Sequence, residues 1–504
     1  MYIIAYDLGT GGAKASLFDM ELRQQASCFV EYATEYPGPG RHEQSPEDWW
    51  KAIVKSTQYL LGKSRVSAES IQGICLSGHS LVSVPIDKNG NRLLDRVPIW
   101  SDIRAEEEAR AFFQQISEEQ WYMQTGNGFP PACYPIFKLM WMKKHQRETY
   151  EKTKVFLGSK DYINFRLTGK MVTDVSYASG SGAWILKEKQ FSEEILAAAD
   201  LDGEKFPPVM LPHTVIGTVT RQAADETGLC AGTAVICGGV DNACMALGAV
   251  GAEEGKCYVS LGSSAWIPVN TAEPILDWEN RAYTFAHLEE NLYTSAFSVF
   301  AAGSSLRWVR DTICADFSNQ TNAYQRMDSL AFRAEAGAGG VLFHPGLAGS
   351  ASDENRALHR GAFVGLSLGT GREELIRAAM EGITANLYLA FKKLQRHTSI
   401  TTPLLFCGGG SKSDFWLQIF ADMFEIEVLK TGLDQEAASL GAAAVALRAL
   451  GIWKDYAKIT DLHDTEKVFY PNEKRKKIYR PLVEKFVYME RTLCKLGENS
   501  IMNK

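Results

Sequence analysis

The chain has 504 residues, which is more than a single hydrophobic core usually holds, so we expect at least two domains. With 45% hydrophobic and 22% charged residues, its composition is typical of a globular protein and argues against a disordered chain. The formal net charge of -7 argues against a nucleic-acid partner, because binding to phosphate backbones needs a basic face.

Neither the N-terminus nor the cysteines indicate export. The first apolar run is interrupted at Asp7, which makes it too short for a signal peptide. Residues 233–252 are weakly polar, but Asp241 and Asn242 lie at their middle, where a membrane span tolerates no acid. The ten cysteines form no CxxC pair, which favours scattered thiols in a reducing compartment over a zinc site. We expect a cytoplasmic protein that does not bind membranes.

The first third of the chain predicts a strand meander followed by alternating helices and strands. Three alternating runs within residues 2–33 predict three strands joined by short links. Ser45 as N-cap and Pro46 in the first turn predict a helix that reaches about residue 61. A strand is expected over residues 70–80 and a helix over residues 101–116.

A similar outline returns in the second half. Residues 255–270 again read as strand, glycine and hydroxyl turn, strand, followed by a strand over residues 291–300 and a helix over residues 304–313. This repetition predicts two related domains with a boundary near residues 245–255. We assign residues 1–247 to the first domain and residues 248–504 to the second.

The first turn, residues 9–12, reads Gly-Thr-Gly-Gly. Glycine lets phosphate oxygens approach backbone N–H groups, Thr10 adds a hydroxyl donor and Lys14 adds a positive charge. The motif is not a P-loop, because GxxxxGK[ST] is absent and a strand follows the turn. The alternative is an ordinary tight turn capped by Asp7.

Two further glycine turns favour a phosphate-binding loop over an ordinary tight turn. Residues 261–264 read Leu-Gly-Ser-Ser, and residues 404–424 read as a strand, three glycines and a helix. Glycines at a helix N-terminus permit close approach of a nucleotide, although a simple strand-to-helix turn would also use them. The three turns together predict a nucleotide site.

One acid is placed for chemistry. Asp241 follows a buried strand and two glycines at the start of a helix of small residues. As an N-cap its charge would be stabilised by the helix end, so we expect an ionised carboxylate at neutral pH. Such a group can accept the proton of a substrate hydroxyl that attacks a phosphorus atom. The alternative is that Asp241 is only a cap.

These parts resemble the FGGY family of carbohydrate kinases, with a pattern closest to its xylulokinase members. Residues 134–145, YPIFKLMWMKKH, are similar to the first signature of the family, and residues 361–382, GAFVGLSLGTGREELIRAAMEG, to the second. The resemblance extends from residue 2 to about residue 450. It implies an α/β fold of two actin-like (ribonuclease-H-like) domains, with ATP and a sugar in the cleft between them.

The resemblance also implies roles for individual residues. Asp241 would be the proton acceptor, ATP the phosphoryl donor and Mg²⁺ the metal, with Asp7 in the metal shell. The nucleotide side would comprise Thr10, Gly11, Gly12, Lys14, Ser263, Gly303, Arg307, Gly409, Gly410 and Asp414. The sugar side would comprise Gly78, His79, Ser80, Trp100, Asp102, Arg104 and Asn242.

Residues 76–87, LSGHSLVSVPID, depart from the family pattern. Gly78 is kept, but His79, Ser80 and Leu81 stand where xylulokinases and glycerol kinases carry other sugar ligands. His79 either contacts substrate or is a turn histidine bonded to backbone. The departure weakens glycerol as substrate, leaves xylulose open, and favours a five- or six-carbon ketose or polyol.

The alternatives are a kinase for glycerol or gluconate and a nucleotide-gated sugar-binding protein without catalysis. The oligomeric state stays open, with a homodimer among the options.

Overall fold

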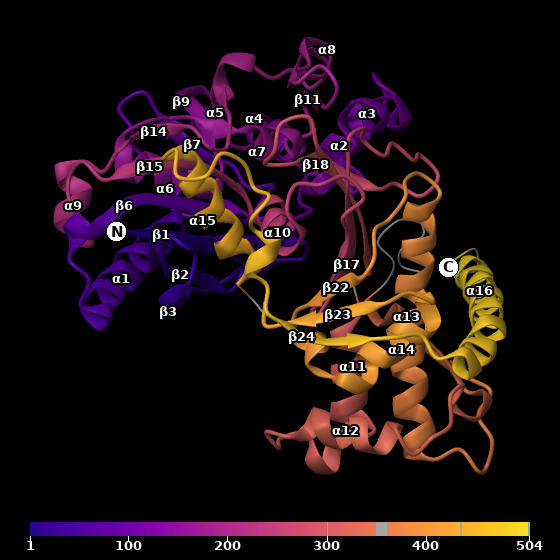
Figure 1. Ribbon diagram of the computed structural model, residues 1–504. Coiled ribbons are helices and arrows are strands. Elements are labelled where there is room, and N and C mark those ends of the chain that lie inside the picture. Colours follow the sequence, from indigo (N-terminus) through magenta and orange to yellow (C-terminus); the bar gives the residue numbers. More distant parts are fainter. Residues whose placement is uncertain (300, 349–359, 434–435, 502–504) are drawn as a thin grey trace. The chain divides into compact units, whose positions relative to one another are not determined.

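The computed structural model describes residues 1–299, 301–348, 360–433 and 436–501 (Figure 1). The chain forms two compact units, each assembled from three segments of the sequence. Unit 1 comprises residues 1–254, 270–295 and 436–462. Unit 2 comprises residues 255–269, 296–435 and 463–504. Because the units are discontinuous in sequence, they do not test the expected division between residues 247 and 248, which stays a prediction.

Unit 1 is built on a six-stranded sheet with the order β14-β15-β6-β1-β2-β3. The expected meander forms: β1 pairs antiparallel with β2, and β2 with β3. Strand β1 pairs in parallel with β6, β6 in parallel with β15, and β15 antiparallel with β14. The strands are β1 (Tyr2–Leu8), β2 (Gly12–Asp19), β3 (Gln24–Glu31), β6 (Ile71–Gly78), β14 (Val215–Thr218) and β15 (Ala234–Val240).

Helices cover both faces of this sheet. On one face, Ile4, Tyr6 and Leu8 of β1 share a buried cluster with Trp49 and Ile53 of α1 (Pro46–Ser64), as the alternation of a strand requires. Ile3 and Ala5, on the other face of β1, are also buried, and α15 (Ala437–Ala449) packs against β1, β6 and β15. Unit 1 is therefore a layered α/β fold.

Helix α15 comes from the C-terminal third of the chain but belongs to unit 1, as its yellow colour among the purple elements in Figure 1 shows. It packs against α10 (Asp241–Val250) at two glycines. A Cβ added at Gly248 would lie 1.8 Å from the carbonyl oxygen of Ala437, and one at Gly441 would lie 2.0 Å from that of Cys244. Only glycine permits this approach, which fixes α10 and its first residue, Asp241.

Shorter elements surround the core of unit 1. Its other helices are α2 (Glu106–Phe112), α3 (Glu118–Thr125), α4 (Pro135–His145), α5 (Arg147–Lys152), α6 (Ser159–Thr168), α7 (Val175–Ser179), α8 (Glu193–Ala198) and α9 (Arg221–Thr227). Its other strands are β4 (Glu35–Gly38), β5 (Arg41–Gln44), β7 (Val84–Asp87), β8 (Val97–Pro98), β9 (Thr153–Leu157), β10 (Thr173–Asp174), β11 (Trp184–Ile185), β12 (Gln190–Phe191), β13 (Val209–Met210) and β18 (Tyr283–Ala286). The helix expected over residues 101–116 is limited to α2.

Unit 2 repeats the strand pattern of unit 1. Strand β16 pairs antiparallel with β17 and in parallel with β22, β22 pairs in parallel with β23, and β23 antiparallel with β24. This succession matches that of β2, β1, β6, β15 and β14, so the repeated outline read from the sequence is confirmed. The strands are β16 (Tyr258–Leu261), β17 (Ala265–Thr271), β19 (Tyr293–Val299), β20 (Leu342–His344), β21 (Ala362–Val364), β22 (Leu404–Cys407), β23 (Val428–Thr431) and β24 (Thr465–Phe469).

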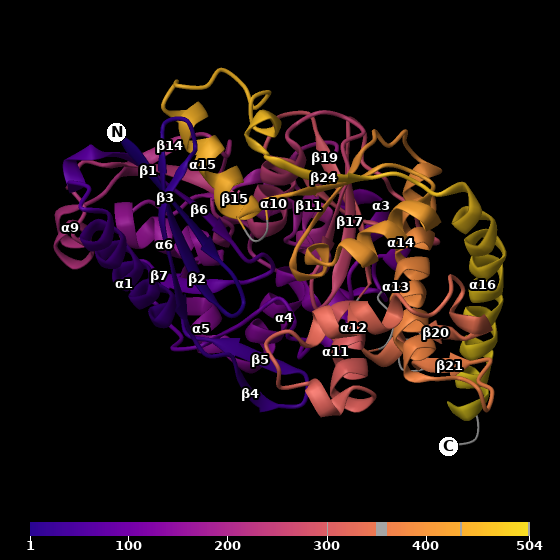
Figure 2. The same cartoon turned by 60° about the horizontal axis from the view of Figure 1, so that its bottom comes forward.

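The helices of unit 2 gather around α13, which is largely buried. Figure 2 shows α13, α14 and α16 side by side, and all three contact one another. The helices are α11 (Gly303–Thr312), α12 (Ala323–Ala331), α13 (Arg372–Gln395), α14 (Asp414–Phe424) and α16 (Glu473–Ile501). Within the described residues, none of the helices combines the length and the apolar character needed to cross a membrane.

Candidate active site

The first phosphate loop of unit 1 joins β1 to β2 and carries a charged cluster. Asp7 lies opposite Lys14 in the hairpin and accepts a hydrogen bond from Ser77 Oγ of β6 at 2.7 Å. Burial raises the pKa of Asp7, while the Ser77 hydroxyl and the charge of Lys14 oppose the rise. Lys14 also forms an ion pair with Glu436, which directly precedes α15. The predicted phosphate-facing lysine thus has a carboxylate partner within unit 1.

Gly11 and Gly12 differ in their surroundings although they belong to one motif. A Cβ added at Gly11 would meet nothing within 4 Å, and Thr10 and Gly11 are both exposed. A Cβ added at Gly12 would lie 2.6 Å from both Phe29 Cζ and the carbonyl oxygen of Val30. The structure therefore explains Gly12 by packing, whereas Gly11 is free to approach a ligand.

Asp241 stands at the start of α10, where the expectation needs a correction. The N-cap is Val240, and Asp241 is the first helical residue. Burial raises the pKa of Asp241 to about 7, and the negative charge of Asp7 adds to the rise. Hydrogen bonds from backbone N–H groups, that of Asn242 at 2.8 Å among them, only partly oppose it. Full ionisation at neutral pH was therefore wrong, because burial outweighs the helix end.

The departing stretch after β6 places His79 in the interior. Its Nδ1 lies 3.0 Å from the carbonyl oxygen of Leu8, and its ring packs edge-on against Trp49. Burial lowers the pKa of His79 to about 4, so the ring is neutral. The Nε2 atom is buried and has no hydrogen-bond partner among the described residues. His79 thus makes the backbone hydrogen bond expected of a turn histidine through Nδ1, and its Nε2 can still bind another group.

Gly78 and Ser80 flank His79. A Cβ at Gly78 would lie 2.9 Å from both Lys160 Cβ and Ser159 Oγ, so close packing requires glycine. Ser80 is only 7% exposed, and its backbone N–H is among the groups that lower the pKa of Asp241. Ser80 and Asn242 therefore adjoin the carboxylate of Asp241, and their contact with a sugar stays a prediction.

The loop after β8 joins the three other sugar-side residues. Arg104 binds both carboxylate oxygens of Asp102, at 2.8 and 2.7 Å, and Glu43 at 2.6 Å. Asp102 is fully buried and also accepts the backbone N–H of His42 at 2.7 Å. Asp102 and Arg104 therefore hold the loop in shape. Trp100 points its indole N–H to Thr10 Oγ1 at 3.0 Å, which joins this loop to the phosphate loop.

The sequence gives no role to two residues of this region, one beside Asp241 and one that holds the neighbouring backbone. The hydroxyl of Tyr283 in β18 hydrogen-bonds with the side chains of Ser80 and Asn242, and its ring stacks on Phe129 at 4.5 Å. Only alternating aromatics of a buried strand mark Tyr283 in the sequence, and no motif contains it.

The second residue, Lys138 of α4, lies in the first signature stretch, which gives it no role. Its Nζ donates to the carbonyl oxygens of Leu81 at 3.1 Å and Ile99 at 2.6 Å. Burial lowers the pKa of Lys138 to about 8. Leu81 has a φ of 60°, a left-handed conformation that is strained for leucine. Lys138 therefore fixes the backbone beside Ser80 and beside Trp100.

A pocket of about 410 Å³ in unit 2 is lined by five of the six predicted nucleotide residues of that unit. Arg307 Nη2 donates to Ser263 Oγ at 3.0 Å, which joins the turn after β16 to α11. A Cβ added at Gly409 would meet nothing within 4 Å, so the turn after β22 is open to a ligand there. The pocket is lined by Leu261, Gly262, Ser263, Gly303, Leu306, Arg307, Thr321, Tyr324, Gln325, Asp328, Gly409, Gly410, Lys412, Ser413 and Trp416.

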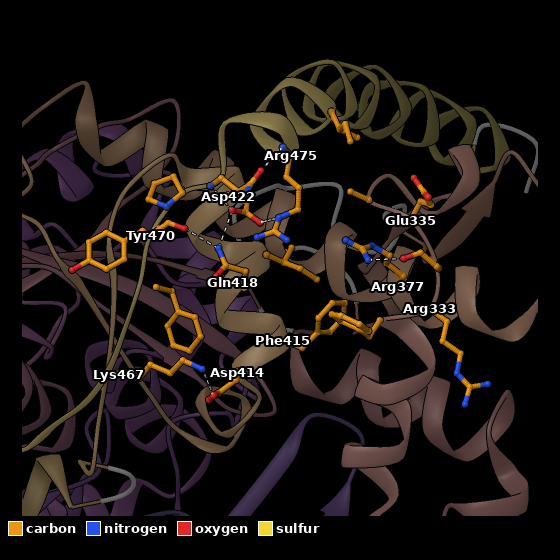
Figure 3. Close-up of a pocket in the computed structure, with 18 of the residues that line it drawn as sticks. Arg333, Glu335, Arg377, Asp414, Phe415, Gln418, Asp422, Lys467, Tyr470 and Arg475 are labelled. Atoms are coloured by element: carbon orange, nitrogen blue, oxygen red, sulfur yellow. Dashed lines mark hydrogen bonds and ion pairs between the residues drawn. The ribbon is translucent and has the colours of Figure 1, made fainter.

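Asp414 does not line this pocket. It lines a second pocket of about 930 Å³ in unit 2, on which Figure 3 is centred. One carboxylate oxygen accepts a hydrogen bond from Lys467 of the same pocket at 2.8 Å, and the other accepts one from Lys430 at 3.0 Å. These lysines hold the pKa of Asp414 below its ordinary value against the effect of partial burial. Asp414, which the resemblance assigns to the nucleotide side, is thus paired with two cations.

The acids of unit 1 fit a magnesium ion of the kind that kinases use. Among the described residues, no group of three or more His, Cys, Asp and Glu side chains is arranged to hold a metal. Mg²⁺ in phosphoryl-transfer sites typically needs only one or two carboxylates, with phosphates and waters completing the shell. Asp7 and Asp241, close enough for one charge to raise the pKa of the other group, meet that requirement.

Comparisons with known proteins identify the family of this chain. The model of the FGGY family of carbohydrate kinases, N-terminal domain, matches residues 2–248, and that of the C-terminal domain matches residues 257–450. The chain is 29% identical over 486 residues to a xylulose kinase of Bacillus subtilis (96% of this chain, 95% of the relative). It is 28% identical over 498 residues to a gluconokinase of Bacillus licheniformis (98% and 96%).

A solved structure is similar over nearly the whole chain. The ligand-bound xylulose kinase from Lactobacillus acidophilus has a TM-score of 0.89 and 28% identity, covering 98% of each chain. With the two matching sheets, this likeness identifies the fold as that of two actin-like ATPase domains. The protein is an ATP-dependent sugar kinase. The chain belongs to the FGGY family of carbohydrate kinases.

Proposed function

We propose that the protein phosphorylates a hydroxyl of a five- or six-carbon ketose or polyol, with xylulose as the first candidate and Asp241 as general base. The observation that carries the proposal is the setting of Asp241. Its carboxylate has a pKa raised to about 7 by burial and by Asp7, and Ser80 and Asn242 adjoin it. A base with a pKa near the working pH is partly ionised at that pH, and its ionised form still binds a proton well.

The reaction needs one proton acceptor. The substrate hydroxyl oxygen attacks the γ-phosphorus of ATP, the bond from that phosphorus to the β–γ bridging oxygen breaks, and ADP leaves. Asp241 takes the hydroxyl proton as the new O–P bond forms. Because the acceptor must be ionised, the reaction depends on the fraction of Asp241 that carries a charge.

The nucleotide residues are proposed to act within their own units. In unit 1, backbone N–H groups of the loop from Thr10 to Gly12 and the charge of Lys14 would bind phosphate oxygens. In unit 2, the 410 Å³ pocket would take the rest of the nucleotide, through Ser263, Gly303, Arg307, Gly409 and Gly410. Asp7 would hold Mg²⁺, which supplies positive charge to the phosphate oxygens.

Sugar recognition is proposed to rest on hydroxyl-bonding groups beside Asp241. Ser80, Asn242 and the Tyr283 hydroxyl form one hydrogen-bonded group there. Trp100 would offer an apolar edge to the carbon chain. Asp102 and Arg104 would act on the sugar mainly by fixing the loop that carries Trp100, because they already bind each other.

Gluconate is the second candidate, because one similar protein is a gluconokinase. Its carboxylate would need a cation in the sugar site. Two cations near Trp100 already have partners, since Lys138 donates to two backbone carbonyls and Arg104 binds Asp102 and Glu43. A site that bonds hydroxyls therefore favours an uncharged sugar.

The ten cysteines are all free thiols, seven of them buried, which supports the proposal that the protein works in a reducing compartment such as the cytoplasm. A homodimer stays a prediction, which sedimentation of the purified protein would test.

Steady-state ADP release with xylulose, ribulose, gluconate, glycerol and common polyols tests the proposal. We expect the highest kcat/KM for a five- or six-carbon ketose or polyol, and a low value for glycerol. Asp241→Asn serves as the control for contaminating kinases, because it should remove the sugar-dependent rate. If glycerol or gluconate gave the highest kcat/KM, the proposed substrate class would be wrong.

A further inference from the structure

Helix α12 forms one wall of the 410 Å³ pocket, and no residue of this helix belongs to the glycine motifs. Tyr324, Gln325 and Asp328 of α12 line the pocket together with Gly409 and Gly410. Residues 324, 325 and 328 lie one helical turn apart or less, so their side chains share one face of α12. The wall therefore presents an aromatic ring, an amide and a carboxyl group.

Asp328 is the acid that faces this pocket. It is half-buried and hydrogen-bonds with the side chain of Ser413, the N-cap of α14 directly after the glycine turn. Asp414, the next residue, lines the other pocket, where it is paired with Lys467 (Figure 3), and it is also paired with Lys430. The two acids thus line different pockets, and among the described residues Asp414 is paired with cations whereas Asp328 is not.

The Asp328 carboxyl is a strong hydrogen-bond acceptor in a sheltered place. Burial raises its pKa to about 6, and Ser413 opposes the rise. Above that pH the group is mostly ionised, with acceptor sites on two oxygens, of which Ser413 needs one. A nucleotide offers matching donors only on its nucleoside part, at the exocyclic amine of adenine and at the ribose hydroxyls, because its phosphates are acceptors at neutral pH.

We propose that Asp328 is the specificity-determining residue for the nucleoside of the phosphoryl donor, accepting a hydrogen bond from the adenine amine or from a ribose hydroxyl. The inference rests on the proposed assignment of this pocket to ATP. If the donor is the adenine amine, guanine places a carbonyl oxygen at that position and is repelled by the carboxylate. If the donor is a ribose hydroxyl, the corresponding deoxynucleotide leaves the second oxygen of the half-buried carboxylate without that donor.

Asp328→Asn tests the proposal with little change in shape. Affinities for non-hydrolysable analogues of ATP, GTP, 2′-deoxy-ATP and 3′-deoxy-ATP are measured by calorimetry on the full chain without sugar. Asp316→Asn is the matched control, because this exposed acid of unit 2 pairs with Arg372 and does not line the pocket. KM for the sugar is measured on each variant as a second readout.

We expect Asp328→Asn to weaken ATP binding about 10- to 100-fold, the range for a hydrogen bond to a charged group, and to leave the sugar KM unchanged. If wild type prefers ATP to GTP and Asp328→Asn loses that preference, the adenine amine is the donor to Asp328. If wild type prefers ATP to a deoxynucleotide and the variant loses that preference, a ribose hydroxyl is the donor.

Unchanged preferences across all four nucleotides would overturn the inference, as would an effect found with Asp414→Asn and not with Asp328→Asn. A failure of the proposed function would look different from these results. Wild type would then phosphorylate no sugar of the panel, while the nucleotide affinities would still decide the role of Asp328.

Discussion

The indole N–H of Trp100 donates a hydrogen bond of 3.0 Å to the side-chain hydroxyl of Thr10. The sequence assigns the two residues to different substrates, Trp100 to the sugar and Thr10 to the phosphates of ATP. The backbone carbonyl of Thr10 accepts a second hydrogen bond, from Gln44 at 2.7 Å. Two hydrogen bonds therefore hold the exposed tip of the first hairpin, one from Trp100 in the sugar-side loop and one from Gln44 of β5.

Trp100→Phe should separate these two roles, because phenylalanine keeps an apolar ring and removes the N–H. A neutral hydrogen bond contributes about 1 kcal/mol, so we expect KM for ATP to rise about 3- to 10-fold. KM for the sugar should change less. Steady-state kinetics checks this, with Trp278→Phe as the control tryptophan of unit 1, whose ring lies under Arg281. An equal effect in both variants would contradict a specific role of the Trp100 bond.

Gly11→Val and Gly12→Val should fail in different ways. Gly11 has open space around an added Cβ, so the variant should keep its melting temperature and lose ATP affinity, because the side chain occupies the phosphate approach. Gly12 lacks that space, with Phe29 and Val30 at 2.6 Å, so its variant should melt at a lower temperature. Thermal unfolding and calorimetry with an ATP analogue measure both. Normal ATP binding by Gly11→Val would make the first turn an ordinary hairpin.

The sequence predicted the local elements of this fold because their causes are local. The alternation in β1, β2 and β3 and the Ser-Pro start of α1 indicate these elements without any partner. The repeated hairpin also indicated the second unit, because its turn chemistry recurs near residue 262.

Features that depend on distant parts of the chain were not predictable in this way. The small residues of α15 indicate burial, but nothing in them names α10 as the helix that they contact. Tyr283 and Asp328 lie outside every motif, and they reach their sites only through the packing of β18 and α12. The ionisation of Asp241 depends on its burial and on Asp7, which is distant in sequence.

The pH dependence of the reaction should show the ionisation of Asp241. Only the ionised carboxylate accepts a proton, and burial raises the pKa of this group to about 7. kcat/KM for the sugar should therefore rise about tenfold per pH unit below pH 7 and level off above it. A plateau that extends down to pH 5 would show that the essential base has an ordinary carboxyl pKa.

Asp7→Asn should shift the acid limb of the pH profile, which is the rise of kcat/KM below pH 7, to lower pH. The negative charge of Asp7 raises the pKa of Asp241, so its removal lowers that pKa. If Asp7 also holds Mg²⁺, Asp7→Asn will be slow at every pH. We therefore compare the pH at which kcat/KM levels off in the variant and in wild type, and not the rates themselves. Asp225→Asn, an exposed acid of α9 in the same unit, is the control and should leave the limb in place. A limb that stays in place in Asp7→Asn as well would show that the two carboxylates do not interact.

Asp241→Asn should be inactive and also more stable at high pH. Loss of a general base typically lowers the rate about 10²- to 10⁴-fold, with nucleotide affinity kept. The pKa of Asp241 is about 7 in the folded protein, above its value of 3.8 as an ordinary carboxyl group. The folded state therefore binds the proton more tightly, so this contribution to stability is complete at low pH and is lost as pH rises through 7.

Asparagine carries no charge at any pH, so the difference in melting temperature between Asp241→Asn and wild type should increase from pH 5 to pH 8.5. For a domain of 150–250 residues, about 1 kcal/mol corresponds to roughly 2–4 °C. Calorimetric scans at the two pH values check this, and Asp225→Asn should show no such increase because its carboxylate is exposed. If the difference for Asp241→Asn were the same at both pH values, the buried carboxylate would already be ionised at pH 5. A base of that kind would hold the substrate proton weakly, and the rate limit would then have to lie in a step other than proton transfer.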